Sequence, residues 1–140
     1  MANEAVNEGA AKVNLIPPKL LGITILTSWK QEDFSDDLLI DQLIDHRVKH
    51  LAEIAFNSGL AGCVCSPREV KFLREIYPET FELVTPGIRS LGSAINDQSR
   101  VSDAAEAIKM GASKLVIGRA ITQSNDPSYM FQSFCNKVFI

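Results

Sequence analysis

Short apolar runs separated by longer amphipathic segments make up most of this chain. Each run has few polar residues, is bounded by turn-forming residues, and is too short to be a helix. Runs of this kind are typical of strands that are buried on both faces, as in a parallel sheet. The pattern predicts four strands, at residues 20–26, 61–65, 81–84 and 114–117.

Helical periodicity occupies the intervals between these runs. Residues 36–58 carry apolar side chains at helical spacing behind an N-cap at Ser35, so they predict one long helix whose apolar stripe belongs to the core. Residues 27–37 are polar and predict a loop. Further helices are predicted over residues 2–13, from Ser66–Pro67 to Pro78, from Ser102 to Gly111, and from Asn125–Asp126–Pro127 toward Val138.

One helix followed by four strand–helix units is therefore the predicted order. The units recur at roughly 30-residue spacing, which is the size of a βα repeat in a parallel sheet. No low-complexity segment or linker divides the chain. The predicted class is α/β, with all four βα units in one domain.

Composition and charge exclude several classes of protein. The 140 residues include 14 Lys and Arg against 17 Asp and Glu, so no basic surface favours nucleic acid. No window approaches the roughly 20 apolar residues of a membrane span. Glu4 and Glu8 interrupt the first residues, so no signal peptide is expected. Three cysteines are too few for a disulfide framework, which favours a reducing, cytoplasmic location.

Candidate binding residues follow the predicted strands. Ligands of parallel α/β folds bind at the carboxyl ends of the strands. There the chain has Thr27–Ser28, Cys65–Ser66, residues 85–89 ending in Arg89, and Gly118–Arg119. An arginine fork suits a phosphate or carboxylate, and a neighbouring glycine lets the ligand approach the backbone. The alternative is that each arginine is a surface residue in a salt bridge.

Motifs along nearly the whole chain resemble the C-terminal half of the orotidine 5'-monophosphate decarboxylase family, in its bacterial form. They occur in the family's order and carry its characteristic residues. The matching segments are Leu26–Thr27–Ser28, Gly62-x-Val64–Cys65–Ser66, Val84–Thr85–Pro86–Gly87–Ile88–Arg89, Asn96–Asp97–Gln98-x-Arg100, Val116–Ile117–Gly118–Arg119-x-Ile121–Thr122 and Asp126–Pro127.

The resemblance implies a fold and a reaction. The fold would be the C-terminal half of a TIM (β/α)₈ barrel, with residues 1–140 supplying strands 5–8 after one helix. The reaction would convert orotidine 5'-phosphate to UMP and CO₂ in pyrimidine biosynthesis, by a lyase that uses no metal or organic cofactor. The complete family fold would form a homodimer in the cytoplasm, without nucleic-acid or membrane partners.

The resemblance also implies roles for individual residues. Thr27 and Ser28 would lie against the pyrimidine edge, and Gln98 would bridge phosphate and base from a covering loop. Arg89, Gly118 and Arg119 would hold the phosphate. These six residues are the predicted substrate-binding set: Thr27, Ser28, Arg89, Gln98, Gly118 and Arg119.

The family's reacting groups have no counterpart in this sequence. The family uses an Asp-x-Lys-x-x-Asp motif and an earlier lysine at a strand end, and no Asp-x-Lys-x-x-Asp occurs here. No catalytic residue is therefore assigned, and the enzyme class holds for the family rather than for this chain alone. Two alternatives stay open: a non-catalytic phosphate-binding relic or split subunit, and another phosphate-binding barrel enzyme that acts on sugar phosphates.

Three further features have plainer interpretations. His46 and His50 share a helix face but lack a third ligand, so a solvated face is favoured over a zinc site. Cys63 and Cys65 are interpreted as small buried residues, although Cys65 lies near the predicted pocket. Trp29 is expected to pack at a rim rather than cover a ligand.

Overall fold

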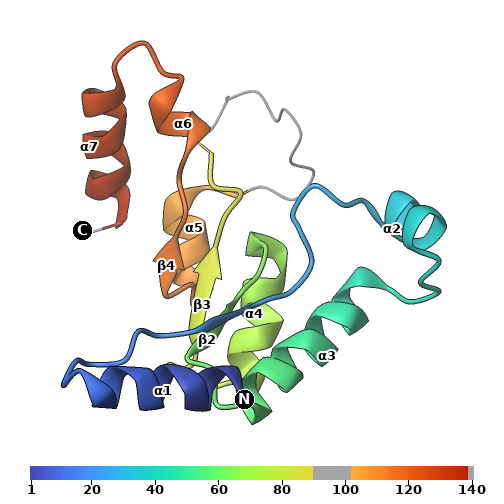
Figure 1. Ribbon diagram of the computed structural model, residues 1–140. Coiled ribbons are helices and arrows are strands. Elements are labelled where there is room, and N and C mark those ends of the chain that lie inside the picture. Colours follow the sequence, from blue (N-terminus) through green and yellow to red (C-terminus); the bar gives the residue numbers. More distant parts are fainter. Residues whose placement is uncertain (90–101, 139–140) are drawn as a thin grey trace.

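The computed structural model describes residues 1–89 and 102–138 of the chain (Figure 1). In these residues the four strands are separated by helices in the predicted order, and two short helices that the pattern did not predict are added. The elements are α1 (Ala2–Lys12), β1 (Leu21–Ile23), α2 (Gln31–Leu38), α3 (Ile44–Asn57), β2 (Gly62–Val64), α4 (Pro67–Ile76), β3 (Glu82–Thr85), α5 (Ala104–Lys109), β4 (Lys114–Leu115), α6 (Arg119–Thr122) and α7 (Pro127–Val138).

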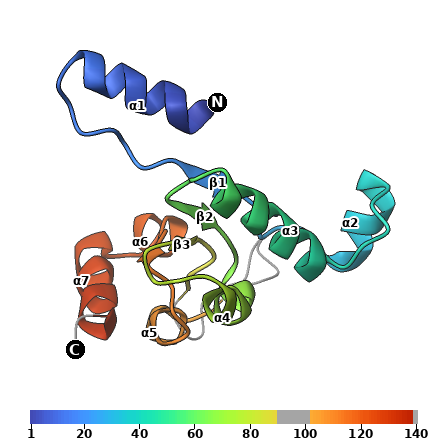
Figure 2. The ribbon, with the colours of Figure 1, turned by 90° about the horizontal axis from the view of Figure 1, so that it is seen from below.

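The strands described form one parallel sheet in the order β1-β2-β3-β4. Consecutive strands are neighbours, and each connection between them runs through helices (Figures 1 and 2). The four predicted βα units are therefore confirmed. β1, β2 and β4 are shorter than the apolar runs that predicted them, because ladder pairing covers only part of each run, whereas β3 has four residues and is shifted by one.

Helices α3, α4 and α5 pack on one face of the sheet and form the core with it. Gly22 shows which face this is, because a Cβ there would lie 2.7 Å from Ala55 Cβ of α3. Its register partner Cys63 is fully buried on the same side. The predicted stripe of the 36–58 segment is core as expected, since Val48 and Ala52 are fully buried.

The single long helix predicted over residues 36–58 is wrong, and so is the loop over 27–37. The chain forms α2 and α3 there, separated by a break in which Leu39 adopts a left-handed φ of 54°. Gln31 fixes the break, since its Nε2 donates to Gln42 O (3.0 Å) and its Oε1 accepts from Ile44 N–H (2.8 Å). Ser35 lies inside α2 and is not an N-cap.

A buried aromatic residue accounts for α2. Phe34 is fully buried and meets Trp29 edge to face, with ring centroids 6.3 Å apart. Burial of an aromatic ring stabilises by a few kcal/mol, enough to order a short polar helix. The predicted packing role of Trp29 is confirmed, since it lies against the core.

Two of the four predicted helix starts are confirmed. Glu69 Oε2 accepts from Ser66 N–H (2.7 Å) at the start of α4, and Asp126 Oδ1 accepts from Tyr129 N–H (2.9 Å) at the start of α7. The N-cap of α5 is Asp103, whose Oδ1 accepts from Ala105 N–H (3.0 Å), so the helix predicted to begin at Ser102 begins one residue later. No helix among residues 1–89 and 102–138 is long and apolar enough to cross a membrane.

None of the helices in residues 1–89 and 102–138 packs on the other face of the sheet, which is partly open. Side chains alternate between faces along a strand, so Leu21 and Ile23 point away from α3. At the foot of this face, Glu82 bonds to Lys19 (2.5 Å) and to Lys114. Lys114 first, then Lys19, lower the pKa of Glu82 below its usual value, chiefly by donating hydrogen bonds to its carboxylate.

Candidate functional site

Thr27 and Ser28 line a hollow of about 240 Å³ at the carboxyl end of the sheet. Thr27 is buried, whereas Ser28 is exposed. The parallel strands bring residues that follow β2 and β3 to the same place. The lining residues are Ile23, Ile25, Leu26, Thr27, Ser28, Val64, Cys65 and Pro86. Two hydroxyls on a mostly apolar wall can form hydrogen bonds to the edge of a flat heterocycle, while the apolar side chains cover its faces and exclude water.

Arg89 lies at the carboxyl end of β3, but it does not line this hollow. The side chain is only 9% exposed, and its Nη1 donates to Ile88 O at 3.0 Å. The backbone around it is fixed, since Arg89 N–H donates to Ser102 O (3.0 Å) and Ser102 N–H to Gly87 O (3.2 Å). This bridge holds Ser102 beside Gly87 and Arg89. Gln98, the predicted bridging residue, lies outside the described residues.

Gly118 and Arg119 lie where β4 leads into α6. Gly118 is the N-cap of α6, and its carbonyl accepts from Ile121 N–H (2.8 Å) and Thr122 N–H (3.1 Å). A Cβ on Gly118 would meet no atom within 4 Å, so the backbone here faces open space. Arg119 is exposed in the first turn of α6. Both residues follow the same edge of the sheet as Thr27, although neither lines the hollow.

Cys65 and Pro86 line the hollow, and the predicted binding set does not include them. The available signal was their place in the sequence, because Cys65 ends the second apolar run and Pro86 follows the third by two residues. Cys65 is fully buried. The pKa of its thiol is raised, chiefly by a hydrogen bond to Cys63 and secondly by burial. A neutral thiol is a weak nucleophile, so Cys65 lines the hollow but does not act as a nucleophile.

Cysteine alkylation should separate the three thiols. We expect iodoacetamide at mildly alkaline pH to label Cys135 in the folded chain, because it is only half-buried. Cys63 and Cys65 are buried and should react only after unfolding. Peptide mass mapping measures the sites, and the Cys135→Ser variant should take up no reagent while folded. Rapid labelling of Cys65 in the folded chain would contradict this account of the wall.

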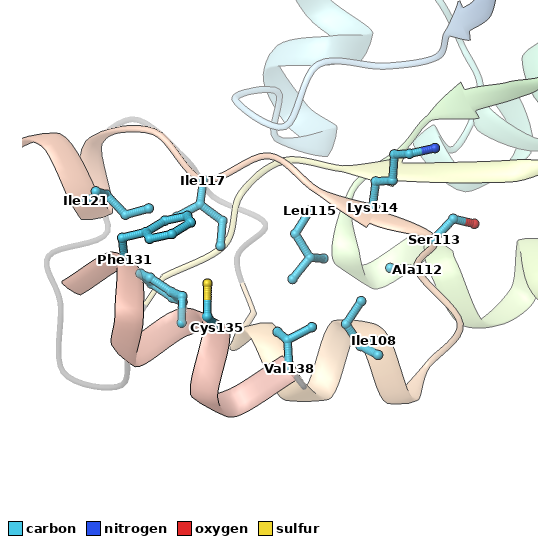
Figure 3. A pocket seen from close by; sticks show the side chains of 11 residues that line it. Ile108, Ala112, Ser113, Lys114, Leu115, Ile117, Ile121, Phe131, Cys135 and Val138 are labelled. Atoms are coloured by element: carbon cyan, nitrogen blue, oxygen red, sulfur yellow. The ribbon is translucent and has the colours of Figure 1, made fainter. Parts of the chain in front are cut away.

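A larger hollow lies elsewhere, between β4, α5 and α7, with a volume of about 670 Å³ (Figure 3). Apolar side chains from all three elements point inward, and Lys114 and Ser113 border one end, where Lys114 is directed away from the groove (Figure 3). None of the predicted substrate-binding residues that the structure describes lines it. Size alone therefore does not identify the ligand site, because this groove offers little to bind a phosphate.

The histidine pair is exposed on α3, as expected for a solvated face. His46 and His50 border a surface hollow of about 410 Å³ together with Lys49 and Glu53. Within residues 1–89 and 102–138, no group of three His, Cys, Asp or Glu side chains is arranged to hold a metal ion.

Comparison with known proteins agrees with this arrangement. The model of the orotidine 5'-phosphate decarboxylase / HUMPS family matches residues 1–134. An orotidine 5'-phosphate decarboxylase of Prochlorococcus marinus strain NATL1A is 82% identical over 140 residues, which are 100% of this chain and 58% of that protein. The enzyme of the same name from strain MIT 9211 is 53% identical over 99% of this chain and 57% of its own length.

Solved structures give the same result for the fold. The crystal structure of orotidine 5'-phosphate decarboxylase from Lactobacillus acidophilus matches with a TM-score of 0.74 and 32% identity, over 90% of this chain and 51% of that one. A second, from Pyrococcus horikoshii, matches at 21% identity with a TM-score of 0.56 and supports the fold alone. The chain spans a little over half the length of the curated relatives it matches, and it belongs to the orotidine 5'-phosphate decarboxylase / HUMPS family.

Proposed function

We propose that this chain is the ligand-holding half of an orotidine 5'-phosphate decarboxylase, with residues 1–140 supplying strands 5–8 of the barrel. The complete enzyme would convert orotidine 5'-phosphate to UMP and CO₂ in the cytoplasm, as a homodimer without nucleic-acid partners. One observation supports the proposal. Thr27 and Ser28 line a hollow at the carboxyl edge of the sheet, and Arg89, Gly118 and Arg119 follow β3 and β4 at the same edge.

The proposed division of labour follows from the chemistry of these groups. The hydroxyls of Thr27 and Ser28 can donate to and accept from the carbonyls and N–H of a pyrimidine. Arg119 suits a phosphate because its planar guanidinium forms two parallel charge-assisted hydrogen bonds. Gly118 suits the same ligand, since no side chain blocks approach to its backbone. Arg89 and Gln98 would complete the phosphate site from the 85–101 segment.

Phosphate binding would support a reaction at the other end of the substrate. Contacts to a non-reacting group can be used to orient and desolvate the reacting group. Loss of CO₂ leaves a carbanion on the pyrimidine, which needs a proton donor. The family's lysine would supply that proton, and its Asp-x-Lys-x-x-Asp motif does not occur in this sequence. The lysine would therefore come from the part of the relatives that this chain does not span.

Removal of the Arg119 guanidinium tests the phosphate site. We expect Arg119→Ala to weaken UMP binding by about 2 kcal/mol, roughly 30-fold, because a charge-assisted contact to the phosphate is lost. Isothermal titration of the chain with UMP measures this. Lys109→Ala is the matched control, since it removes one positive charge from the exposed last turn of α5, at the opposite end of the strands.

Two other results have clear meanings. Equal affinity of the parent chain and Arg119→Ala would remove Arg119 from the site. No binding of UMP by the parent chain would reject the proposal and favour a relic without ligand. Uridine, which lacks the phosphate, should bind more weakly than UMP and should be insensitive to Arg119→Ala.

A further inference from the structure

Thr24 differs from its neighbours in how it meets the candidate hollow. Every residue from Ile23 to Ser28 lines the hollow except Thr24, which is buried. Its hydroxyl instead donates to Val64 O at 2.7 Å, and its N–H donates to the same carbonyl at 3.3 Å. A carbonyl oxygen has two lone pairs and can accept both bonds. Thr24 is therefore bonded twice to β2, one residue beyond the end of β1.

These two bonds join two walls of the hollow. Val64 and Cys65 line it from β2 and the residue that follows, whereas residues 25–28 line it from the segment after β1. The paired residues of the two strands end at Ile23 and Val64. Thr24 extends the connection by one residue, immediately before the segment that carries Thr27.

The hydroxyl bond holds the backbone as well as the side chain of Thr24. Branching at Cβ leaves threonine few rotamers, so a hydroxyl bonded to Val64 O also fixes the Thr24 backbone against β2. Thr27 lies three residues further on, within a turn in which Trp29 N–H donates to Leu26 O at 3.2 Å. A rotation at Thr24 would therefore displace the Thr27 hydroxyl, and a displacement of about 1 Å is enough to weaken oriented binding.

We propose that Thr24 is a positioning residue for the pyrimidine end of the proposed site. By joining the segment after β1 to Val64 O, it sets where the Thr27 hydroxyl meets the edge of a heterocyclic ring. Thr24 acts through Thr27 and does not touch the ligand, since it does not line the hollow. The inference rests on the proposed function for the identity of the ligand.

Titration of Thr24 variants with UMP and with uridine tests the proposal. We expect Thr24→Val to weaken both ligands about fivefold, because loss of a neutral hydrogen bond displaces the group that meets the base. The variant should fold, since Val64 O keeps its bond from the backbone N–H of residue 24. Thr24→Ser keeps a hydroxyl and should bind both ligands within about twofold of the parent chain. A loss confined to UMP, or no loss, would overturn the proposal.

Two controls separate positioning from a loss of stability. Ser113→Ala removes a hydroxyl that accepts from Leu83 N–H (3.0 Å) at the amino end of the sheet, so it should lower the unfolding temperature and leave both affinities unchanged. In a Thr27→Val background, Thr24→Val should have less than about a twofold further effect, because the hydroxyl through which it acts is gone. A full further loss in that background would show that Thr24 does not act through Thr27.

The chain's one tryptophan gives a readout that needs no ligand. Trp29 lies two residues beyond Thr27 and meets Phe34 edge to face. We expect acrylamide to quench its fluorescence at least about 1.5-fold more efficiently in Thr24→Val, and as in the parent chain in Thr24→Ser and Ser113→Ala. Unchanged quenching in Thr24→Val would overturn the proposal whether or not a ligand binds. Raised quenching in a chain whose parent binds neither UMP nor uridine would reject the proposed function and leave the placement of Thr27 by Thr24 intact.

Discussion

The chain by itself should leave orotidine 5'-phosphate decarboxylation at its uncatalysed rate, and addition of the remaining half of the barrel should raise that rate at least about 10⁶-fold. The reason is that this chain supplies the proposed ligand-binding residues, whereas the family's proton-donating lysine is absent from it. The described site offers hydroxyls, a buried arginine and a neutral thiol, but no lysine lines the hollow. Without a proton donor at the developing carbanion, oriented binding alone stabilises little of the transition state.

The measurement is UMP formation from orotidine 5'-phosphate by the chain, by the other half, and by their complex. A Lys→Ala change in the Asp-x-Lys-x-x-Asp motif of the added half should abolish turnover and leave UMP binding largely unchanged. Arg119→Ala in the complex should lower kcat/KM while the assembled mass is unchanged. Robust turnover by the 140-residue chain alone would show that the assignment of the missing groups is wrong.

Gly62→Ala is expected to be the most destabilising single-methyl change in the sheet. A Cβ at this position would lie 2.1 Å from Glu82 O and 2.8 Å from Glu82 C in the neighbouring strand. Because these are backbone atoms, relief requires β2 and β3 to move apart, which breaks their register. We expect a loss of about 3 kcal/mol or more, a large part of the 5–15 kcal/mol that stabilises a typical domain.

Gly9→Ala is the matched control for that change. Gly9 lies inside α1, and a Cβ there would meet no atom within 4 Å. Removing a mid-helix glycine should therefore stabilise α1 by about 0.5–1 kcal/mol. Thermal unfolding followed by far-UV circular dichroism measures both variants. If Gly62→Ala unfolded at the same temperature as the parent chain, the close approach of β2 to β3 at Gly62 would be contradicted.

The prediction of a long helix over residues 36–58 failed for a reason that local patterns do not contain. Apolar residues recur at helical spacing through Ile40 and Leu43, and no glycine or proline marks a break. The break depends on Gln31, whose amide reaches across to Gln42 and Ile44. Burial of Phe34 against Trp29 then orders α2. Both are contacts between elements, which periodicity along one segment does not reveal.

The candidate ligand site also has features that the sequence indicated and features that only contacts between strands revealed. The sequence placed Thr27, Ser28, Arg89 and Gly118–Arg119 at strand ends, because strands and their order follow from short apolar runs. It placed Cys65 near the predicted pocket but did not include Cys65 or Pro86 in the binding set, although both line the hollow with Thr27. Nor did it indicate that Arg89 is buried with its guanidinium bonded to Ile88 O. These outcomes depend on how neighbouring strands stagger, and residue spacing along one strand does not encode stagger.

Sequence alone determined the α/β class, the four βα units and the helix starts at Ser66 and Asp126. Each follows from interactions within a few residues: apolar runs, serine or aspartate caps, and glycine or proline at boundaries. Only the tertiary structure decided which face of the sheet the helices cover and which face exposes Ile23 and Val116. That choice depends on close packing, such as the approach of Gly22 to Ala55, between residues far apart in the chain.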